Sequence, residues 1–190
     1  AIGHNEGMRS ILCLFEGVVT GAADGYARMS DKPALTLLHV GSGLANGMAN
    51  LHNARRAHVP LVNIVGDHAT YHLQYDAPLT SDVPAHANIS SHWVRVSDSA
   101  DDLAASGAEA VQASLTGSGK IATLIAPANH AWEDAHKTVT PRPAPAMQKA
   151  AESTLAAVVT ALKSGKNSAL LLGGRALREE SLALAGRISK

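Results

Sequence analysis

The stretch "RSILCLFEGVVTGAADGYARMSDKPALTLLHV", residues 9–40, contains the pattern that decides the fold. Its two ends, residues 9–15 and 33–40, are short apolar runs of strand length. Between them, residues 17–29 place apolar side chains at helical spacing: Val18, Ala22, Tyr26 and Met29. A strand, a helix and a second strand in succession predict a β-α-β unit, whose two strands lie parallel in one sheet.

The same alternation continues along the chain. We expect a helix over 43–57, a strand over 60–65, an irregular stretch over 67–91, a strand over 93–96, a helix over 99–116 and a strand over 121–126. Strands separated by helices indicate a parallel sheet with helices on both faces, joined by right-handed crossovers. The predicted fold class is therefore α/β, with a three-layer αβα parallel sheet.

A proline-rich segment, residues 137–148, follows the last of these strands and is typical of a semi-rigid linker. Residues 1–136 then form one domain, which we expect to lack its first β-α unit because it opens directly on a strand. Residues 149–190 are expected to be the truncated start of a second α/β domain. Its predicted elements are a helix over 149–164, a strand over 168–173 and a helix over 176–189.

Composition narrows the possible functions. The formal charge is zero and aromatic residues make up 3% of the chain, which argues against a nucleic-acid partner. Apolar runs fall short of the roughly 20 residues that a membrane span needs, and the polar start of the sequence lacks a signal-peptide core. The single cysteine, Cys13, suits a reducing compartment. We therefore expect a cytoplasmic protein without a membrane partner.

Glu16 is the candidate catalytic residue of the first β-α-β unit. It directly follows the predicted strand 9–15, and ligands of open α/β sheets bind at the carboxyl ends of strands. Gly17, Gly21 and Gly25 recur every four residues on the following helix, so a backbone or a ligand is expected to pack closely there. A second interpretation stays open, because an acid at a helix start also interacts favourably with the helix dipole.

Residues 15–67 resemble the pyrimidine-binding domain of thiamine-diphosphate-dependent enzymes of the acetolactate synthase and benzoylformate decarboxylase group. The resemblance rests on Glu16 nine residues before "GYAR", on "GSGLAN" after a short strand, and on a strand that begins at Pro60 and ends in Gly-Asp. The segment "LLLGGRAL", residues 170–177, resembles the start of the middle domain of such enzymes. The resemblance spans nearly the whole chain but only part of such an enzyme.

The resemblance implies a role for individual residues. Glu16 would hydrogen-bond N1′ of the cofactor's aminopyrimidine, so that the neighbouring nitrogen can accept the thiazolium C2 proton. His39 falls where benzoylformate decarboxylase carries an active-site histidine. A turn over 41–46 would line the pyrimidine through Gly41, Ser42, Gly43 and Asn46. Thiamine diphosphate would be the cofactor, with its diphosphate and Mg²⁺ bound by a domain absent from this chain.

Several functions remain open on this basis. An acetolactate synthase-like carboligase or decarboxylase acting on a 2-oxo acid is the main hypothesis, with active sites shared between subunits of a homodimer or homotetramer. His39 favours a benzoylformate decarboxylase-like lyase, although a histidine at a strand end can also be satisfied by backbone groups. A non-catalytic α/β module that serves assembly is the alternative from another class.

Other motifs carry weaker signals. "GSGLAN" lacks the third glycine of a dinucleotide-binding turn. "GDH", residues 66–68, departs from the family's magnesium-diphosphate motif in its third residue. His68 and His72 are four residues apart, as metal-binding histidines on a helix would be, but they lack the intervening acid of a metalloprotease motif. We therefore predict no metal site formed by this chain.

Overall fold

The computed structural model describes residues 6–189 of the chain, which divides into two compact units, Ala1–Ala144 and Pro145–Lys190. Among the described residues of the first unit, four strands form one sheet in the order β1-β2-β4-β3, and every neighbouring pair is parallel. The strands are β1 (Ala34–His39), β2 (Leu61–Asp67), β3 (Trp93–Val96) and β4 (Ile121–Pro127). The prediction of an α/β fold with a parallel sheet is confirmed.

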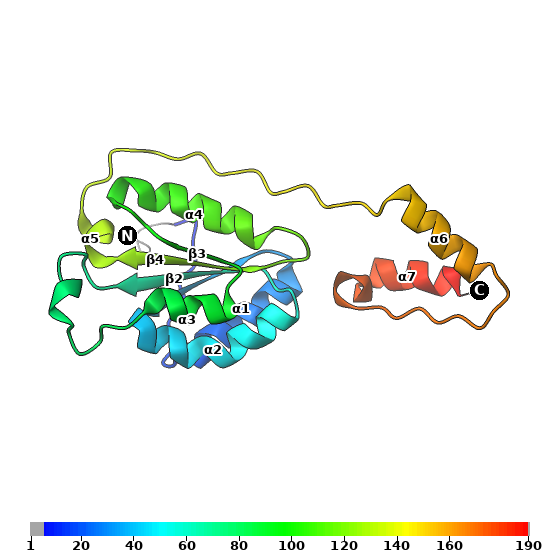
Figure 1. Ribbon diagram of the computed structural model, residues 1–190, viewed down its shortest axis with the longest axis horizontal. Coiled ribbons are helices and arrows are strands. Elements are labelled where there is room, and N and C mark those ends of the chain that lie inside the picture. Colours follow the sequence, from blue (N-terminus) through cyan, green and yellow to red (C-terminus); the bar gives the residue numbers. More distant parts are fainter. Residues whose placement is uncertain (1–5, 190) are drawn as a thin grey trace. The chain divides into compact units, whose positions relative to one another are not determined.

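Helices connect these strands and cover the sheet (Figure 1). They are α1 (Glu16–Ser30), α2 (Val40–Arg56), α3 (Val83–Ser90), α4 (Ala100–Ser114) and the short α5 (Ala128–Trp132), with a 3₁₀ turn η2 (Leu73–Tyr75). Helices α1, α2 and α3 lie on one face of the sheet and α4 lies on the other, as Figure 1 shows. The three-layer αβα arrangement predicted from the sequence is therefore present.

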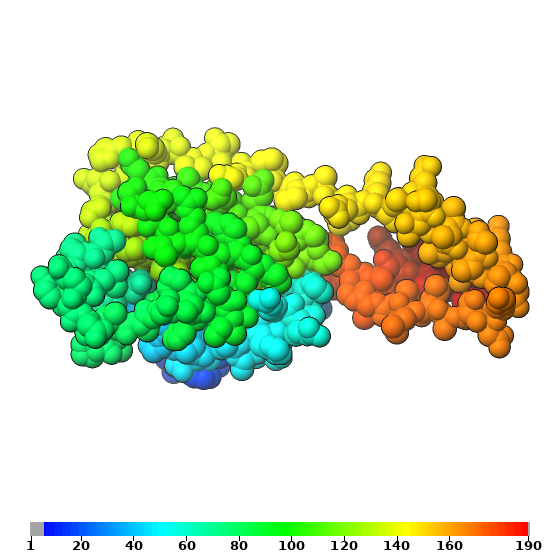
Figure 2. All heavy atoms as spheres, in the orientation of Figure 1, coloured from blue at the N-terminus to red at the C-terminus, as the bar shows by residue number. Residues whose placement is uncertain are grey.

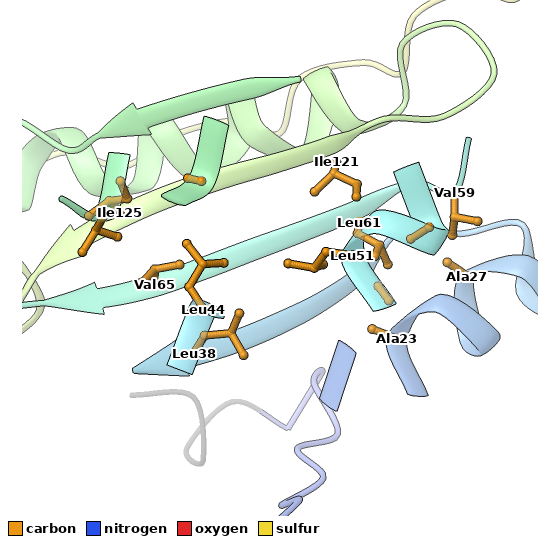
Figure 3. Close-up of a cluster of buried hydrophobic side chains, with 14 residues drawn as sticks. Ala23, Ala27, Leu38, Leu44, Leu51, Val59, Leu61, Val65, Ile121 and Ile125 are labelled. Atoms are coloured by element: carbon orange, nitrogen blue, oxygen red, sulfur yellow. The ribbon is translucent and has the colours of Figure 1, made fainter. Parts of the chain in front are cut away.

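The larger core lies between the sheet and the layer formed by α1, α2 and α3 (Figure 3). Leu44, Leu51 and Leu61 are fully buried there. A smaller cluster around Val62, Ala110 and Leu124 seals α4 onto the opposite face. Burying such a side chain contributes about 1.5–3 kcal/mol, so these two layers hold the sheet in place.

Polar side chains also cross the interior of the sheet. Thr36 Oγ1 donates to Asn63 Oδ1 at 2.7 Å, and Asn63 Nδ2 donates to Thr123 Oγ1 at 3.0 Å. The hydroxyls of Thr123 and Ser91 lie 2.7 Å apart. These buried groups satisfy one another across β1, β2 and β4. A shift in the pairing of the strands would break these hydrogen bonds. The hydrogen bonds therefore help to specify the register of the sheet.

The predicted strand over residues 9–15 is wrong. Residues 9–13 have no regular secondary structure, and residues 14 and 15 form a bend before α1. Ile11, Leu12 and Leu14 are 69%, 89% and 97% exposed, so this apolar run neither joins the sheet nor enters the core. Residues 9–15 read as a buried strand because they are apolar, but a strand also needs a hydrogen-bonding neighbour, which this run does not find within residues 6–189.

Two further boundaries differ from the prediction. The expected turn over 41–46 is the first part of α2, which begins at Val40 rather than at residue 43. The expected irregular stretch over 67–91 contains α3. Asp82 caps this helix by accepting a hydrogen bond from the Ala85 backbone N–H at 2.9 Å, and Pro84 lies in its first turn. Both are sequence signals of a helix start.

The second unit contains α6 (Glu152–Leu162), a 3₁₀ turn η3 (Gly174–Leu177) and α7 (Glu179–Ile188). The strand predicted over 168–173 is wrong, since these residues have no regular structure and Leu171 is fully exposed. Among residues 145–189 no side chain is buried. The linker expected over 137–148 is free of helix and strand and includes the boundary between the units. Within residues 6–189 no helix is both long and apolar enough to span a membrane.

Candidate active site

Glu16 is the first residue of α1, and its side chain turns toward α2. Its Oε2 accepts a hydrogen bond from Asn46 Nδ2 at 3.1 Å. Its Oε1 lies over Gly43, where an added methyl group would come within 3.4 Å of it. Glu16 is half-buried, so the carboxyl group is held by a partner on one side and remains accessible on the other. Glu16, Gly43 and Asn46, three of the residues predicted for the site, thus lie together.

Close contact between α1 and α2 brings these residues together. Thr20 Oγ1 donates to the Gly47 carbonyl at 3.0 Å, and Asn50 Nδ2 donates to the Gly17 carbonyl at 2.7 Å. A methyl group on Gly47 would lie 2.7 Å from Thr20 Cγ2. Of the three glycines expected to allow close packing on α1, Gly21 faces an α2 side chain, since a methyl group there would lie 3.0 Å from Asn50 Nδ2, whereas a methyl group on Gly17 would clash with the Phe15 ring. Gly25, however, meets no described atom within 4 Å.

The remaining residues predicted for this turn lie apart from the carboxyl group. Gly41 is buried, and a methyl group added to it would clash with Ser81 Oγ and approach His86 Nδ1. Gly41 therefore faces the loop before α3. Ser42 is exposed on the first turn of α2. Because residues 41–46 are helical, successive residues face different sides of α2. The prediction of a turn over "GSGLAN" could not show which of them face Glu16.

His39 ends β1 and precedes the first residue of α2. Its side chain is exposed, and within the described part of the chain its ring makes no hydrogen bond. His39 Cβ and Glu16 Oε1 both lie within about 4 Å of the position that a Gly43 Cβ would occupy. The structure therefore brings His39 and Glu16, the two predicted catalytic residues, to neighbouring positions at one edge of the sheet.

The chain turns sharply between β1 and α2. Val40 adopts φ +47°, a left-handed conformation that is rare for a β-branched residue. It is buried, so the surrounding packing holds it there. Strained backbone of this kind occurs most often at functional sites, where it directs side chains. Here it lies where the chain passes from the end of β1 into α2, directly after His39.

A pocket of about 350 Å³ adjoins His39. Its lining comes from the carboxyl ends of β1 and β2, from the following loop and from α5: His39, Val40, Asp67, His68, Ala69, Tyr71, His72, Ala128 and Trp132. The arrowheads of β2 and β4 in Figure 1 point to this end of the unit, where α5 and the loop after β2 lie. The same loop forms the outer margin of this end in Figure 2. The pocket is thus where an open α/β sheet binds ligands.

Two histidines of this pocket form a stacked pair. The rings of His68 and His72 have centroids 5.7 Å apart and are inclined by 14°. His68 Nδ1 lies 3.3 Å from Asp67 Oδ1, which also accepts the His68 backbone N–H at 2.8 Å. The His72 ring also contacts the Tyr75 ring, with centroids 5.7 Å apart. The four-residue spacing of the two histidines gives no indication of this stacking in the sequence.

The described residues include no cluster of three or more metal-ligating side chains. His68 and His72 form a stacked aromatic pair, and both line the pocket. Their partners, Asp67 and Tyr75, come from the end of β2 and from η2. Sequence spacing could not reveal this arrangement, because the loop folds back on itself rather than forming a continuous helix.

Comparisons with known proteins agree on one family. Residues 1–92 match the family described as thiamine pyrophosphate enzyme, N-terminal TPP binding domain. The chain is 53% identical over 182 residues to a Mycobacterium tuberculosis protein named as an acetolactate synthase large subunit, IlvX. That match covers 95% of this chain and 35% of the relative. The chain is also 42% identical over 76 residues to benzoylformate decarboxylase of Pseudomonas aeruginosa, a match that covers 40% of this chain and 14% of that enzyme.

Solved structures show the same fold. The benzoylformate decarboxylase of Polynucleobacter necessarius superimposes with a TM-score of 0.77 at 22% identity, over 86% of this chain and 31% of that one. A thiamine diphosphate-dependent 4-hydroxybenzoylformate decarboxylase of Rhodococcus jostii gives a TM-score of 0.70 at 21% identity, over 87% of this chain and 32% of that one. At this level of identity the likeness concerns the fold alone. The chain spans about a third of the length of these proteins.

Proposed function

Residues 1–92 of this chain belong to the N-terminal TPP binding domain family of thiamine pyrophosphate enzymes, and on this premise we propose that the chain activates the cofactor's aminopyrimidine in an enzyme acting on 2-oxo acids. Glu16 is the residue that we propose for this task. The observation that carries the proposal is its carboxyl group, held by Asn46 on one side and lying over the side-chain-free surface of Gly43.

The residues present fit an aminopyrimidine. A flat heterocycle needs an acid that can share a proton with a ring nitrogen and a surface without protruding side chains. Glu16 offers the acid, and Gly43 lets its carboxyl group lie close against α2, because a methyl group on this glycine would come within 3.4 Å of Oε1. When bound, thiamine diphosphate supplies the electron sink for cleavage of the bond next to a carbonyl group.

Within this proposal the chain's own residues have distinct tasks. Glu16 holds or releases a proton at N1′ of the pyrimidine, as a general acid or base does. Asn46 positions the carboxyl group, because its amide donates to Oε2 and leaves Oε1 directed at Gly43. His39 lies beside this pair with a ring that no described residue engages, and it can exchange protons with the substrate.

The free ring of His39 favours a decarboxylase, the second candidate function. A histidine satisfied by backbone groups would serve structure, but His39 lines the pocket instead. The likeness to benzoylformate decarboxylase over 76 residues supports the same choice, whereas the longer match, at 53% identity, supports an acetolactate synthase-like carboligase. Both are reactions of 2-oxo acids, so the proposed substrate class is common to the two candidates.

The site needs further parts. We propose that another domain binds the diphosphate group and Mg²⁺, and that a homodimer or homotetramer shares the active sites between subunits. The exposed apolar side chains of α1 support such an assembly, since Val18, Tyr26 and Met29 are 56%, 56% and 81% exposed. A cytoplasmic location is part of the same proposal.

Replacing Glu16 tests the proposal. In a polypeptide that carries these residues together with a diphosphate-binding domain, Glu16→Gln is expected to slow deuterium exchange at the cofactor's C2 by about 10²- to 10⁴-fold, the usual contribution of a general acid or base. Glutamine keeps the shape and the contact with Asn46 but cannot exchange the proton. Deuterium incorporation at C2, measured by NMR after acid quench, gives the rate.

The matched control is Glu152→Gln, which also replaces a glutamate at the first position of a helix, α6, but lies outside the site. It is expected to leave the exchange rate unchanged. If Glu16→Gln exchanges C2 as fast as Glu152→Gln, Glu16 serves only the helix start. The non-catalytic assembly module would then be the better description of this chain.

A further inference from the structure

We propose that His72, stacked on His68, binds the carboxylate of the substrate in the pocket beside His39. This inference rests on the proposed function and adds a specificity-determining residue to it. His72 would touch the substrate directly, whereas His68 would act as a positioning residue. The substrate class is a small 2-oxo acid with an apolar side chain.

The position of His72 supports this role. It lines the same pocket as His39, and His39 in turn adjoins Glu16 at Gly43. A ligand in this pocket therefore lies beside both the His72 and the His39 rings. His72 is exposed, so no hydrophobic core explains its presence there.

The chemistry of the pair explains why a carboxylate would bind. An ionised carboxylate such as Asp67 can only accept hydrogen bonds, so the contact at 3.3 Å makes His68 Nδ1 the donor and fixes that ring. The His72 ring stacks on this fixed ring at 5.7 Å and contacts Tyr75 on another side. A histidine ring carries an N–H donor in either charge state, and within the described residues neither His72 ring nitrogen has a hydrogen-bond partner.

The rest of the pocket wall suits an apolar group. Val40, Ala69 and Ala128 provide aliphatic surface, and Tyr71 and Trp132 provide aromatic surface. A ligand with a carboxylate at one end and an apolar group at the other matches these two kinds of wall. A dianionic or sugar-like substrate would find few polar partners beyond the histidines of this wall.

The test compares an acid with its uncharged ester. Phenylglyoxylate and methyl phenylglyoxylate have the same apolar group and differ in the carboxylate. We expect the chain to bind the acid at least ten-fold more tightly than the ester, as measured by NMR titration without cofactor. His72→Phe keeps an aromatic ring for stacking but removes the N–H, so the ratio of the two dissociation constants should fall to about one while the ester binds as before.

Three further variants separate the roles. His72→Gln restores an N–H donor and should recover part of the acid preference. His68→Ala removes the stacking partner and should weaken acid binding, and His68→Phe, which restores the stacked ring without the contact to Asp67, should recover part of it. His52→Phe, on the exposed side of α2, is the matched control and should leave both constants unchanged.

An unchanged acid-to-ester ratio in His72→Phe would overturn the inference, and so would a wild-type chain that binds neither compound. Both results are independent of the C2 exchange rate in the Glu16→Gln experiment, because the titration uses no cofactor. The two proposals can therefore fail separately.

Discussion

Gly47 lies where α2 packs tightly against α1. A methyl group there would lie 2.7 Å from Thr20 Cγ2, and Thr20 is fully buried with its hydroxyl bonded to the Gly47 carbonyl. We expect Gly47→Ala to lower the free energy of unfolding by about 1–3 kcal/mol, the usual cost of overpacking. Urea unfolding followed by circular dichroism measures the change.

Gly25→Ala is the matched control on α1. No described atom lies within 4 Å of the position of its added methyl group, so the higher helix propensity of alanine should stabilise the protein by up to about 1 kcal/mol. Changes of opposite sign in the free energy of unfolding would show that Gly47 is required for close helix packing and that Gly25 is not. Equal effects would contradict the packing argument.

Among the candidate site residues, His39 follows a rule of parallel sheets, because it ends β1 at the carboxyl edge of the sheet. Glu16 does not follow this rule, since residues 9–15 before it form no strand, and only the resemblance to a known family indicates it. His72 was beyond that rule, since its importance comes from a ring contact with His68 that depends on how a long loop folds. For Gly41, the prediction of a turn gave no indication that the helical conformation makes this residue face Ser81.

At the scale of elements, the start of α4 is held by a charged network. Asp102 accepts hydrogen bonds from Ser106 Oγ at 2.7 Å and from Arg95 Nη2 at 2.9 Å. Partial burial acts to raise the pKa of Asp102, but the hydrogen bonds from Ser106 and the Asp98 backbone and the charge of Arg95 outweigh it, so this pKa lies below its usual value. The carboxylate therefore favours the folded state.

Because the pKa of Asp102 is lower in the folded than in the unfolded protein, its contribution is complete above the unfolded value and is lost as the pH falls through the folded value. We expect Asp102→Asn to reduce the free energy of unfolding by about 1 kcal/mol at pH 7, with solvent screening taken into account. The difference from the wild type should shrink between about pH 5 and pH 2.

The sequence predicted the elements well wherever a periodic pattern had a partner to pack against. Strand β3 matches its predicted bounds, and α1 matches within one residue at each end. The strands predicted over 9–15 and 168–173 are wrong, because an apolar run forms a strand only when a neighbouring strand is available for hydrogen bonding. Helix α3 was not predicted, although its capping residue, Asp82, can be read from the sequence. Its eight residues are too few to show a clear helical spacing of apolar side chains.

At the scale of the whole molecule, the two units differ in how they are held together. The first unit buries hydrophobic side chains on both faces of its sheet. It also buries the hydrogen-bonded polar side chains that link Thr36 to Ser91 through Asn63 and Thr123. In the second unit, α6 and α7 contain no buried residue among those described. Since burial is the main source of folding free energy, the first unit should account for the cooperative unfolding of the chain.

Limited proteolysis tests this division. Lys137 and Lys149 lie in or beside the exposed linker over 137–148, so trypsin should cut there before it cuts within the sheet and its helices. The Arg142–Pro143 bond should resist trypsin, and mass spectrometry identifies the sites used.

The surviving first unit should melt within about 2 °C of the intact chain, a shift that corresponds to less than about 1 kcal/mol. The surface contact between Arg142 and Glu109 at 3.0 Å, lost after cleavage at Lys137, is too weak to change this. Early cleavage within the first unit, or a drop of more than about 5 °C, would mean that the second unit stabilises the first.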